Sequence, residues 1–539
     1  MAMESTSSGP RIAIIGAGAA GLATGIALRR KFPAFRNFVI YEKANEVGGT
    51  WRDNIYPGCS SDVAVHFYSL STDLNPDWGR THGSQPELLE YLRNVVDKYD
   101  LRPHIVFNTQ VVSAVWNQER SKYIVTTKAA PKHDTSRVLQ REQIHEQLEK
   151  EHHQTISEVE VLVSALGILE VTRYPDIPGL GEFGGDMFHS GTWNHDVVLK
   201  GKRVAVVGNG TSGAQIVPAI SEDPSVNVVN ICRTPVWYFP LADHAYGAVT
   251  KWIFRNIPLC LRLHRCYHFL LSELLYLLVF SNSGFRPLLR MVMLLYMKFK
   301  APKKYYKSIV PKYSPGCKRL VMDRPQFLKS LHRPNVNMNW DGIERITKDG
   351  ILTKKGEHLP FDVIIFATGY IGDDYPLCVK GVCETVQEYY ARKGGPMAYC
   401  GTVLPGFPNF FMLGGPNTGT GHTSAYFTQE TEVRDLPFPY LSLKFSELQI
   451  GYALNFIQLL LSGAITSFEV KNESTEEYNE LIQRRLKNSV FVTCASWYRK
   501  DNNGKISYIF PGSATRFWWG LRKVNWKHFN VTTKAGGGP

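Results

Sequence analysis

The stretch RIAIIGAGAAGLATGIALRRK, residues 11–31, predicts a short apolar strand, a glycine-rich turn and a helix in direct succession. Within it Gly16, Gly18 and Gly21 form a GxGxxG turn, and Glu42 ends the strand that follows. The first glycine permits a tight turn, the second lets backbone approach a pyrophosphate at the helix N-terminus, and the third lets helix and strand pack. The acid accepts hydrogen bonds from ribose hydroxyls. Together these residues predict a dinucleotide-binding fold.

The same pattern starts again near the middle of the chain. Gly208, Gly210 and Gly213 repeat the turn after a second apolar strand. The next strand ends in Arg233 and Thr234, where a site for NAD offers an acid. A cation at this point suits the 2′-phosphate of NADPH. The alternative for Arg233 is a surface cation at a strand end.

Two dinucleotide folds in one chain predict FAD on the first and a hydride donor on the second, because a flavin needs a supply of reducing equivalents. The spacing leaves oxygenase, disulfide reductase and oxidase open. A reductase usually carries a cysteine pair near the first fold, and only Cys59 lies there. An apolar strand at 363–367 and a glycine-rich loop at 414–421 follow later. We therefore predict an α/β architecture with two Rossmann-like folds, the second inserted in the first.

We expect three segments along the chain. Residues 1–180 form the first part of an FAD-binding domain, 181–360 an NADPH-binding domain, and 361–539 the second part of the FAD-binding domain with the C-terminal segment. The polar stretches at 128–158 and 427–449 receive no function, and the first is predicted to be an exposed insertion or hairpin extension.

The length of 539 residues and a composition of 44% hydrophobic and 20% charged residues indicate a globular protein of several domains. Its formal net charge is +13, and residues 248–307 contain eleven Lys and Arg against Glu273 alone. This helical insertion, at about 245–310, either packs on the body of the protein or forms a basic, apolar cap that touches an anionic membrane surface or collects an apolar substrate. No apolar run in it reaches the roughly 18 residues of a spanning helix. No recognised nucleic-acid-binding motif accompanies the charge, so we expect no nucleic-acid partner.

The cysteines and the first residues predict a cytoplasmic protein, and the basic helical insertion leaves a peripheral contact with a membrane open. Residues 1–10 lack the basic and then apolar pattern of a secretory signal. The nine cysteines are scattered, and the one close pair, Cys378 and Cys383, follows no strand-to-helix glycine turn where a disulfide could face a flavin. We expect all nine to be unpaired, and we predict no metal site.

Three further blocks of sequence stand in order with the two glycine turns. The pattern FxGxxxHxxxW is formed by Phe183, Gly185, His189 and Trp193. A GxW, YPG and acid block consists of Gly49, Trp51, Tyr56, Pro57, Gly58 and Asp62. A block with a lysine–arginine pair consists of Gly316, Lys318, Arg319, Leu320 and Asp323. In these blocks the chain resembles the Baeyer-Villiger monooxygenases, over most of residues 11–520.

The resemblance implies an enzyme that uses FAD, NADPH and molecular oxygen to convert a ketone into an ester or lactone through a peroxyflavin. It gives Arg319 the role of the active-site cation and Asp62 that of the acid that pairs with it, and a permanently charged planar donor suits the oxygens of peroxide and adduct. An ion pair that only fixes a loop would also explain both residues.

The glycine turns and the resemblance together predict a set of cofactor contacts. The set is Gly16, Gly18, Gly21, Glu42, Gly49, Thr50, Trp51, Ser60, Ser61, Asp62, Tyr68, Val111, Gly208, Gly210, Thr211, Ser212, Gly213, Gln215, Arg233, Thr234 and Lys318. For Trp51 and Tyr68 the alternative is aromatic packing in the core. For His189 and Trp193 the resemblance implies coupling of NADPH binding to domain movement, and a buried structural role is the alternative.

Two departures from the family pattern leave the reaction open. Asn194 stands where the family usually has proline or aspartate, and residues 366–370 read FATGY, a form more familiar in flavin monooxygenases that oxidise nitrogen or sulfur. Such an enzyme is the main alternative, and a flavin-binding protein without turnover is another. The length and insertions resemble fungal members that act in secondary metabolism, which implies a sizeable apolar, polyketide-like ketone as substrate.

Overall fold

The computed structural model describes the chain in eight ranges: 12–130, 154–240, 242–281, 284–372, 374–429, 449–496, 498–499 and 504–533. Most of the two polar stretches predicted at 128–158 and 427–449 lies outside the described residues. The flanks of the first stretch form a hairpin, because β5 (Lys122–Ala129) pairs antiparallel with β6 (Thr155–Val159).

The first glycine turn follows the central strand of a five-stranded parallel sheet. Its strand order is β21 (Phe410–Met412), β7 (Val161–Ser164), β1 (Ile12–Ile15), β2 (Phe38–Tyr41) and β3 (Ile105–Val106). The first four strands are buried over their whole length, as strands covered on both faces require. Helix α1 (Ala19–Lys31) leaves the turn, and α3 (Gln85–Lys98) begins with a capping box between Ser84 and Glu87.

The second glycine turn follows the central strand of another five-stranded parallel sheet. Its order is β14 (Val336–Asn339), β11 (Asn227–Ile231), β10 (Arg203–Val207), β18 (Val363–Phe366) and β9 (Asp186–His189). Helix α5 (Thr211–Ile220) leaves the turn. The predicted architecture of two dinucleotide-binding folds, the second inserted in the first, is confirmed.

The predicted segment boundary at residue 360 is wrong for β18. This strand pairs with β10 from Val204↔Val363 to Val207↔Phe366, so it is a central strand of the second sheet and not part of the first fold. An apolar strand followed by glycine fits either parallel sheet. The choice depends on a pairing between strands about 160 residues apart, which local sequence does not reveal.

Smaller elements connect and cover the two sheets. A four-stranded sheet contains β20 (Cys378–Lys380), β4 (Thr109–Asn117), β5 and β6. Three further pairs of strands are β8 (Val171–Thr172) with β19 (Tyr370–Ile371), β12 (Tyr238–Phe239) with β13 (Val321–Met322), and β22 (Ser467–Val470) with β23 (Phe529–Thr532). A three-stranded sheet has β16 (Gly350–Thr353) between β15 (Ile343–Thr347) and β17 (His358–Pro360). The remaining helices outside the insertion are α2 (Thr50–Asp53), α10 (Phe327–Ser330), α11 (Val386–Arg392), α12 (Ala425–Gln429), α13 (Gln449–Leu461), α14 (Asn472–Lys487) and α15 (Ala514–Leu521).

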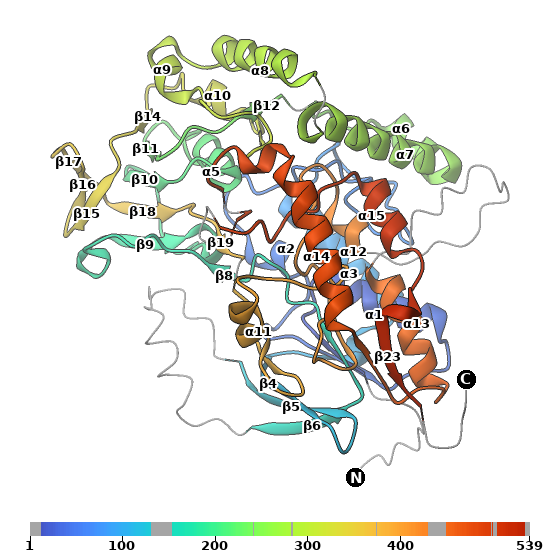
Figure 1. Cartoon of the computed structure of the whole chain (residues 1–539). Coiled ribbons are helices and arrows are strands. Elements are labelled where there is room, and N and C mark those ends of the chain that lie inside the picture. The colour runs from blue at the N-terminus through green and yellow to red at the C-terminus, as the bar shows by residue number, and fades with distance from the viewer. Residues whose placement is uncertain are drawn as a thin grey trace.

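The predicted insertion is helical and runs along one edge of the molecule (Figure 1). It contains α6 (Ala248–Asn256), α7 (Pro258–Leu275), a π-helical turn at Tyr276–Phe280, α8 (Arg286–Lys300) and α9 (Tyr306–Ile309). Its inner side chains, Phe269, Met293 and Met297 among them, are buried in the main core, so the insertion packs on the body of the protein. Over the described residues, no helix has both the length and the apolar content needed to cross a membrane.

The expectation that every cysteine is unpaired is wrong for two of them. Cys317 and Cys494 form a disulfide, and the other seven cysteines are free. The partners are separated by 177 residues in sequence, and only the fold brings their Cα atoms to 6.1 Å, within the range that a disulfide spans. The bond joins the segment just before Lys318 and Arg319 to the C-terminal part of the chain.

Buried histidines make the stability of the fold depend on pH below neutrality. Burial lowers the pKa of His66 and His268 to about 3 and that of His82 and His189 to about 4. In the unfolded chain these side chains bind protons near pH 6.5, so between about pH 6.5 and 4 the unfolded state binds more protons than the folded state. The free energy of unfolding is therefore constant with respect to these groups above pH 7 and falls as the pH drops below about 6.5.

We expect the melting temperature to fall steadily from pH 6.5 to pH 4.5, and the variant His66→Phe to fall less steeply. The ring nitrogens of His66 make no hydrogen bond in the described part of the chain, and its ring packs edge-on against Tyr246 and Phe254, which phenylalanine can reproduce. The wild-type cost at pH 4.5 is about 3 kcal/mol for this one group. Calorimetry of both proteins across the range tests this, and equal slopes would show that His66 is not one of the responsible groups.

Candidate active site

One large cavity connects the two glycine turns. Its volume is about 2790 Å³, several times the roughly 300–1,000 Å³ of an ordinary small-molecule pocket, so it has room for two dinucleotides and a substrate. Its lining comes from both parallel sheets, from the α2 region and from the loops around Arg319 and Tyr426. The cavity therefore collects residues from segments that are hundreds of positions apart.

The first turn is shaped by contacts that only glycine permits. Gly16 has a φ of +103°, and a Cβ at Gly21 would lie 1.9 Å from the carbonyl oxygen of Gly16. Glu42 is buried at the end of β2, as expected, and one of its carboxylate oxygens accepts from the backbone N–H of Ala17 at 2.8 Å. Arg52 donates to the other oxygen at 2.7 Å. Arg52 was not predicted as a site residue, although it directly follows Trp51 in the GxW block.

The second turn lies beside two converging cations. Lys318 and Arg233 both line the cavity, and the pKa of Lys318 is lowered by burial and by the positive charge of Arg233. Two like charges that face one another are relieved when an anion binds between them. Thr234 adjoins them, and its carbonyl oxygen accepts from the side-chain amide of Asn209 at 3.1 Å.

The glycines of the second turn give a matched pair of variants. A Cβ at Gly213 would lie 2.2 Å from the carbonyl oxygen of Gly208, whereas a Cβ at Gly210 meets nothing within 4 Å in the protein. We expect Gly213→Ala to destabilise the fold by about 2 kcal/mol or more.

Gly210→Ala should leave the melting temperature unchanged and raise KM for NADPH about tenfold, the cost of one lost close contact. Thermal denaturation and steady-state kinetics separate the two effects. A loss of stability in Gly210→Ala equal to that of Gly213→Ala would contradict the role given to Gly210.

Arg319 and Asp62 form an ion pair on the wall of the cavity. Nη2 of Arg319 donates to Oδ2 of Asp62, and the carboxylate charge raises the pKa of Arg319. The arginine side chain is 46% exposed while lining the cavity, and that of Asp62 is 16% exposed. Within the described ranges this is the one hydrogen bond that Arg319 makes, so its remaining N–H groups can serve a ligand. The predicted pair is thus present, in a geometry that allows more than the fixing of a loop.

Aromatic side chains form the wall next to this pair. The ring of Tyr68 packs edge-on against Trp51 at 5.7 Å between centroids and against Tyr426 at 4.5 Å. All three also line the cavity, so core packing and a cavity-lining role coexist at these positions. Tyr508 lines it too and stacks on Tyr498 at 6.0 Å, and both tyrosines lie close enough to Arg319 to interact with its charge. Tyr426 and Tyr508 were not predicted. The glycine-rich loop at 414–421 is recognisable in the sequence, but the segments that fold against it carry no motif.

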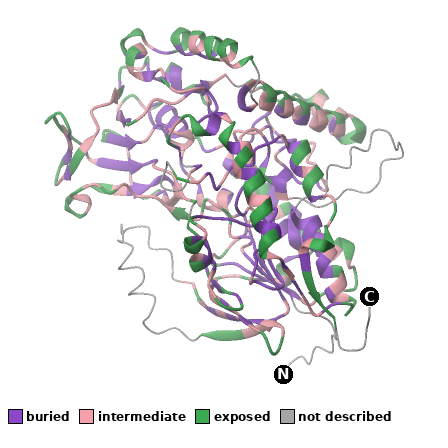
Figure 2. Ribbon diagram, in the orientation of Figure 1, coloured by how far each residue is buried: buried purple, intermediate pink, exposed green. Residues whose placement is uncertain are grey.

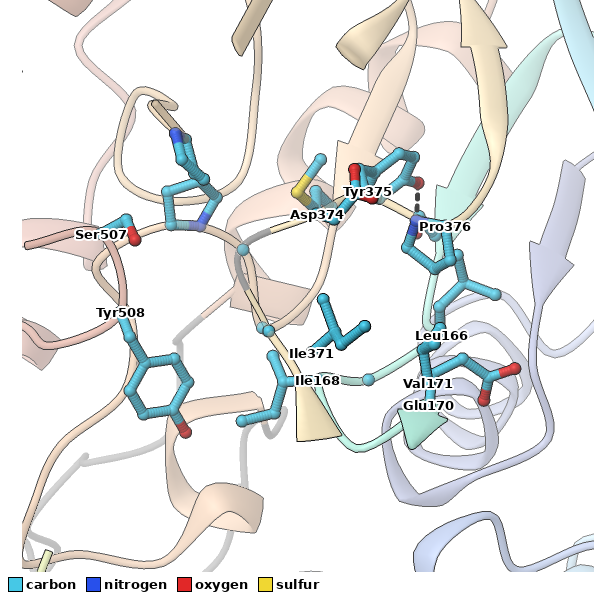
Figure 3. A pocket seen from close by; sticks show the side chains of 18 of the residues that line it. Leu166, Ile168, Glu170, Val171, Ile371, Asp374, Tyr375, Pro376, Ser507 and Tyr508 are labelled. Carbon is cyan, nitrogen blue, oxygen red and sulfur yellow. Dashed lines mark hydrogen bonds between the residues drawn. The ribbon is translucent and has the colours of Figure 1, made fainter. Parts of the chain in front are cut away.

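The cavity extends into a small side pocket that shares part of its wall. Figure 3 shows Ile168 and Ile371 between Tyr508 on one side and Leu166 and Glu170 on the other. The hydroxyl of Tyr375 donates to Oγ of Ser164 at 2.7 Å at the edge of this pocket. The pocket is therefore an apolar recess of the same site.

Most predicted cofactor contacts line the cavity, and four do not. Gly21 and Gly213 lie behind it, where the third glycine of each turn packs helix against strand. The Ser61 side chain donates within its own loop to the carbonyl oxygen of Val63. Gln215 accepts from Tyr56 at 3.0 Å and donates to the carbonyl oxygen of Ser60 at 3.0 Å. Gln215 therefore joins the second fold to the first, from behind the cavity wall.

The YPG block and the FxGxxxHxxxW pattern also serve contacts between segments. A Cβ at Gly58 would lie 2.6 Å from the carbonyl oxygen of Gln215, so this glycine lets the two folds approach. His189 is fully buried between the rings of Tyr174 and Tyr370, each 5.6 Å away. Tyr370, the last residue of FATGY, donates to the side-chain oxygen of Asn54 at 2.7 Å.

Comparison with known proteins agrees with the fold and the arrangement of the site. Residues 9–246 match the family model described as FMO-like, flavin-binding monooxygenase-like. A Baeyer-Villiger monooxygenase of Pseudomonas aeruginosa is 34% identical over 97% of this chain and 92% of its own length. The FAD-binding monooxygenase ktnD of Aspergillus niger is 32% identical over 96% of this chain and 81% of its own length. The crystal structure of OTEMO in complex with FAD and NADP has the same fold, with a TM-score of 0.80, 22% identity and coverage of 97% of this chain and 100% of that chain.

Two dinucleotide-binding sheets around one cavity, with a paired arginine on its wall, define a flavin-dependent monooxygenase that takes its electrons from a nicotinamide dinucleotide. Within that class, the chain belongs to the Baeyer-Villiger monooxygenase family.

Proposed function

We propose that the protein is an FAD- and NADPH-dependent Baeyer-Villiger monooxygenase that converts a sizeable apolar ketone into an ester or lactone with molecular oxygen. The observation that carries the proposal is the pair of Arg319 and Asp62 on the wall of the cavity, next to the cation Lys318. One segment thus places a charge for the reacting oxygens directly beside a charge for the nucleotide. Membership of the family supports the same activity.

The residues around the first turn fit FAD. A Cβ at Gly49 would lie 3.0 Å from the Cα of Gly18, so the two glycines keep a narrow backbone cradle free of side chains. Glu42 is held at the end of β2 for the ribose, and Trp51, Tyr68 and Val111 supply apolar surface for a flat ring system. We infer that the first sheet holds FAD.

The residues around the second turn fit NADPH. Lys318, Arg233 and Thr234 lie together where the 2′-phosphate of the ribose would reach, and the mutual repulsion of the two cations favours a doubly charged anion there. Helix α5 begins at the turn and directs its N-terminal N–H groups toward the pyrophosphate position. We infer that the second sheet, β18 included, holds NADPH.

When bound, NADPH supplies a hydride and FAD activates molecular oxygen. The chain positions and stabilises the reactants. Arg319 carries a charge that does not titrate near neutral pH and lines the cavity, so its remaining N–H groups can hold a negatively charged oxygen and the carbonyl oxygen of a ketone. Asp62 fixes the plane of the guanidinium. The aromatic side chains of Trp51, Tyr68 and Tyr426 line the same cavity and, in the proposed reaction, help to exclude water from the reacting atoms.

The substrate class in the proposal rests on the wall of the cavity. Tyr68, Tyr426 and Tyr508 offer broad aromatic surface, and Ile168 and Ile371 line the adjoining recess. Such a wall suits a large, weakly polar molecule. We extend this to a polyketide-like ketone of fungal secondary metabolism, in line with the similarity to FAD-binding monooxygenases of Aspergillus species.

We propose that the enzyme is cytoplasmic and that it contacts a membrane only peripherally. Seven of the nine cysteines are thiols in the structure, as a reducing compartment favours, whereas the Cys317–Cys494 disulfide is of a kind that is rare there. The basic insertion at 248–307 is the part of the chain that would make the contact.

Product analysis tests the proposed reaction. The purified protein, loaded with FAD and supplied with NADPH and air, is offered a bulky apolar ketone, a thioether and a tertiary amine in separate reactions. We expect esters or lactones from the ketone in amounts that match the NADPH consumed. Sulfoxide or N-oxide formation with no ester would instead identify the nitrogen- or sulfur-oxygenating enzyme that FATGY and Asn194 left open. Failure of NADPH to bleach the flavin would identify a flavin-binding protein without turnover.

A further inference from the structure

Large apolar side chains are exposed in one region of the molecule far more than elsewhere. Of the 27 large hydrophobic residues that are exposed in the described part of the chain, 16 lie between residues 249 and 299. They are Val249, Trp252, Ile257, Leu259, Leu263, Tyr267, Leu270, Leu271, Leu274, Leu277, Phe285, Leu288, Met291, Val292, Leu295 and Phe299. We call this set the outer face of the insertion. Figure 2 shows it as the exposed side of α6, α7 and α8, along one edge of the molecule.

The outer face of α7 follows helical spacing without a polar interruption. After Pro258, every exposed position of this helix holds a leucine or a tyrosine, from Leu259 through Tyr267 to Leu274. The positions recur every three or four residues, so they form one stripe along the helix. On α8 a second stripe runs from Phe285 to Phe299 at the same spacing. An apolar stripe this long is rare on a protein surface that meets only water.

The inner side of the same helices is fully occupied, so the outer stripe is not a core surface that failed to pack. Nη1 of Arg265 donates to the backbone oxygens of His66 and Ser69 at 2.9 and 2.8 Å. Glu273 accepts from the backbone N–H of Ala514 at 2.7 Å and from the hydroxyl of Thr515 at 2.8 Å. These bonds fix which side of α7 faces outward.

Exposed basic side chains border the outer face on the side of α8. Arg290, Lys298 and Lys300 are exposed on α8, and Lys303, Lys304 and Lys307 are exposed just beyond it. The whole stretch 248–307 holds eleven basic residues and one acid, and that acid, Glu273, is engaged with α15. Apolar side chains within a basic rim match a bilayer surface, where acyl chains lie beneath anionic headgroups. A second copy of the chain is a poorer match, because two like rims of high positive charge would meet.

We propose that the outer face of the insertion docks on the surface of a membrane that contains anionic lipid. The helices lie in the plane of the interface with their leucine, tryptophan and phenylalanine side chains among the acyl chains, and the lysines and arginines contact the headgroups. Docked in this way, the enzyme meets a substrate that partitions into lipid. The nature of this substrate rests on the proposed function, whereas the docking does not.

Vesicle binding by the full-length, FAD-loaded protein tests the proposal. We expect the wild type to sediment with vesicles of phosphatidylcholine and phosphatidylserine and to bind vesicles of phosphatidylcholine alone about tenfold or more weakly. The double variant Leu270→Glu, Leu274→Glu should lose binding to the mixed vesicles by about tenfold or more, since it places two charges in the stripe. A control, Ile156→Glu with Val198→Glu, changes two apolar residues outside the insertion that are more exposed than Leu270 and Leu274, and it should bind like the wild type.

Each contrary outcome overturns the proposal. Absence of wild-type binding to the mixed vesicles does so directly, and equal losses in the two double variants show that the insertion is not the contact. A wild-type dimer in sedimentation velocity that Leu270→Glu, Leu274→Glu turns into a monomer, without vesicle binding, identifies the outer face as an interface between copies. Ketone oxygenation measured without vesicles reports on the proposed reaction separately.

Discussion

Arg319→Ala lowers the rate of ketone oxygenation by about a thousandfold, while reduction of the flavin by NADPH continues. Arg319 lines the cavity and makes one hydrogen bond within the described residues, to Asp62, and in the proposed reaction its remaining N–H groups stabilise the negative charge that develops. Loss of one such donor costs about 10²–10³ in kcat in enzymes that stabilise an oxyanion, and here the lost donor is also charged. Parallel measurement of ester formation and of anaerobic flavin bleaching separates the two steps.

Two further variants distinguish chemistry from a structural role of the ion pair. Arg319→Lys keeps the charge and loses the planar fork, so it should recover only a small part of the oxygenation rate. Asp62→Asn removes the carboxylate that fixes the guanidinium and should give an intermediate loss. If Arg319→Lys restores full activity, or if Arg319→Ala loses melting temperature and flavin reduction together, the pair serves to fix a loop.

Replacement of Lys318 and Arg233 by alanine together removes the preference for NADPH over NADH by about a hundredfold or more. Each is expected to make a charge-assisted contact to the 2′-phosphate, worth about 1.5–3 kcal/mol. The pKa of Lys318 is already lowered by burial and by the positive charge of Arg233, and both side chains line the same cavity. NADH lacks the phosphate, so its kcat/KM should change little.

Steady-state kinetics with both nucleotides measure this preference in the double variant and in each single variant. A double variant that loses kcat/KM equally for NADPH and NADH would show that the two cations hold the structure of the segment and do not read the phosphate. Lys303→Ala, at an exposed lysine on the insertion and away from the cavity lining, serves as the matched control for a general loss of positive charge.

The glycine turns predicted both sheets because the steric constraint that requires glycine lies within each turn. The clash that a Cβ would make at Gly21 or Gly213 lies within the same turn, so the sequence pattern carries the whole constraint. The membership of β18 in the second sheet and the pairing of Cys317 with Cys494 depend on contacts between distant segments. No spacing rule reveals such contacts, and both predictions were wrong for that reason.

In the candidate site, too, the residues that belong to motifs were predictable, and those in segments without a motif were not. Asp62 and Arg319 could be paired from family pattern alone, and the structure brings them into contact across 257 residues of sequence. Tyr426 and Tyr508 lie in segments without a motif, and only the folded cavity shows that they line it. The outer face of the insertion is a further case, because the sequence shows apolar and basic residues together but not which of them remain exposed.

Insertion of an oxygen atom from O₂ into a ketone, and the role of Arg319 in it, can be tested directly by isotope incorporation. The wild type and Arg319→Ala are each supplied with ¹⁸O₂ and a bulky apolar ketone. If the enzyme is a Baeyer-Villiger monooxygenase, we expect mass spectrometry to find one labelled oxygen in each ester or lactone from the wild type, with one NADPH consumed for each product. From Arg319→Ala we expect labelled ester at about a thousandth of the wild-type rate, although NADPH still reduces its flavin. Unlabelled product, or labelled ester at an equal rate from both proteins, would contradict the assignment of the reaction and of Arg319.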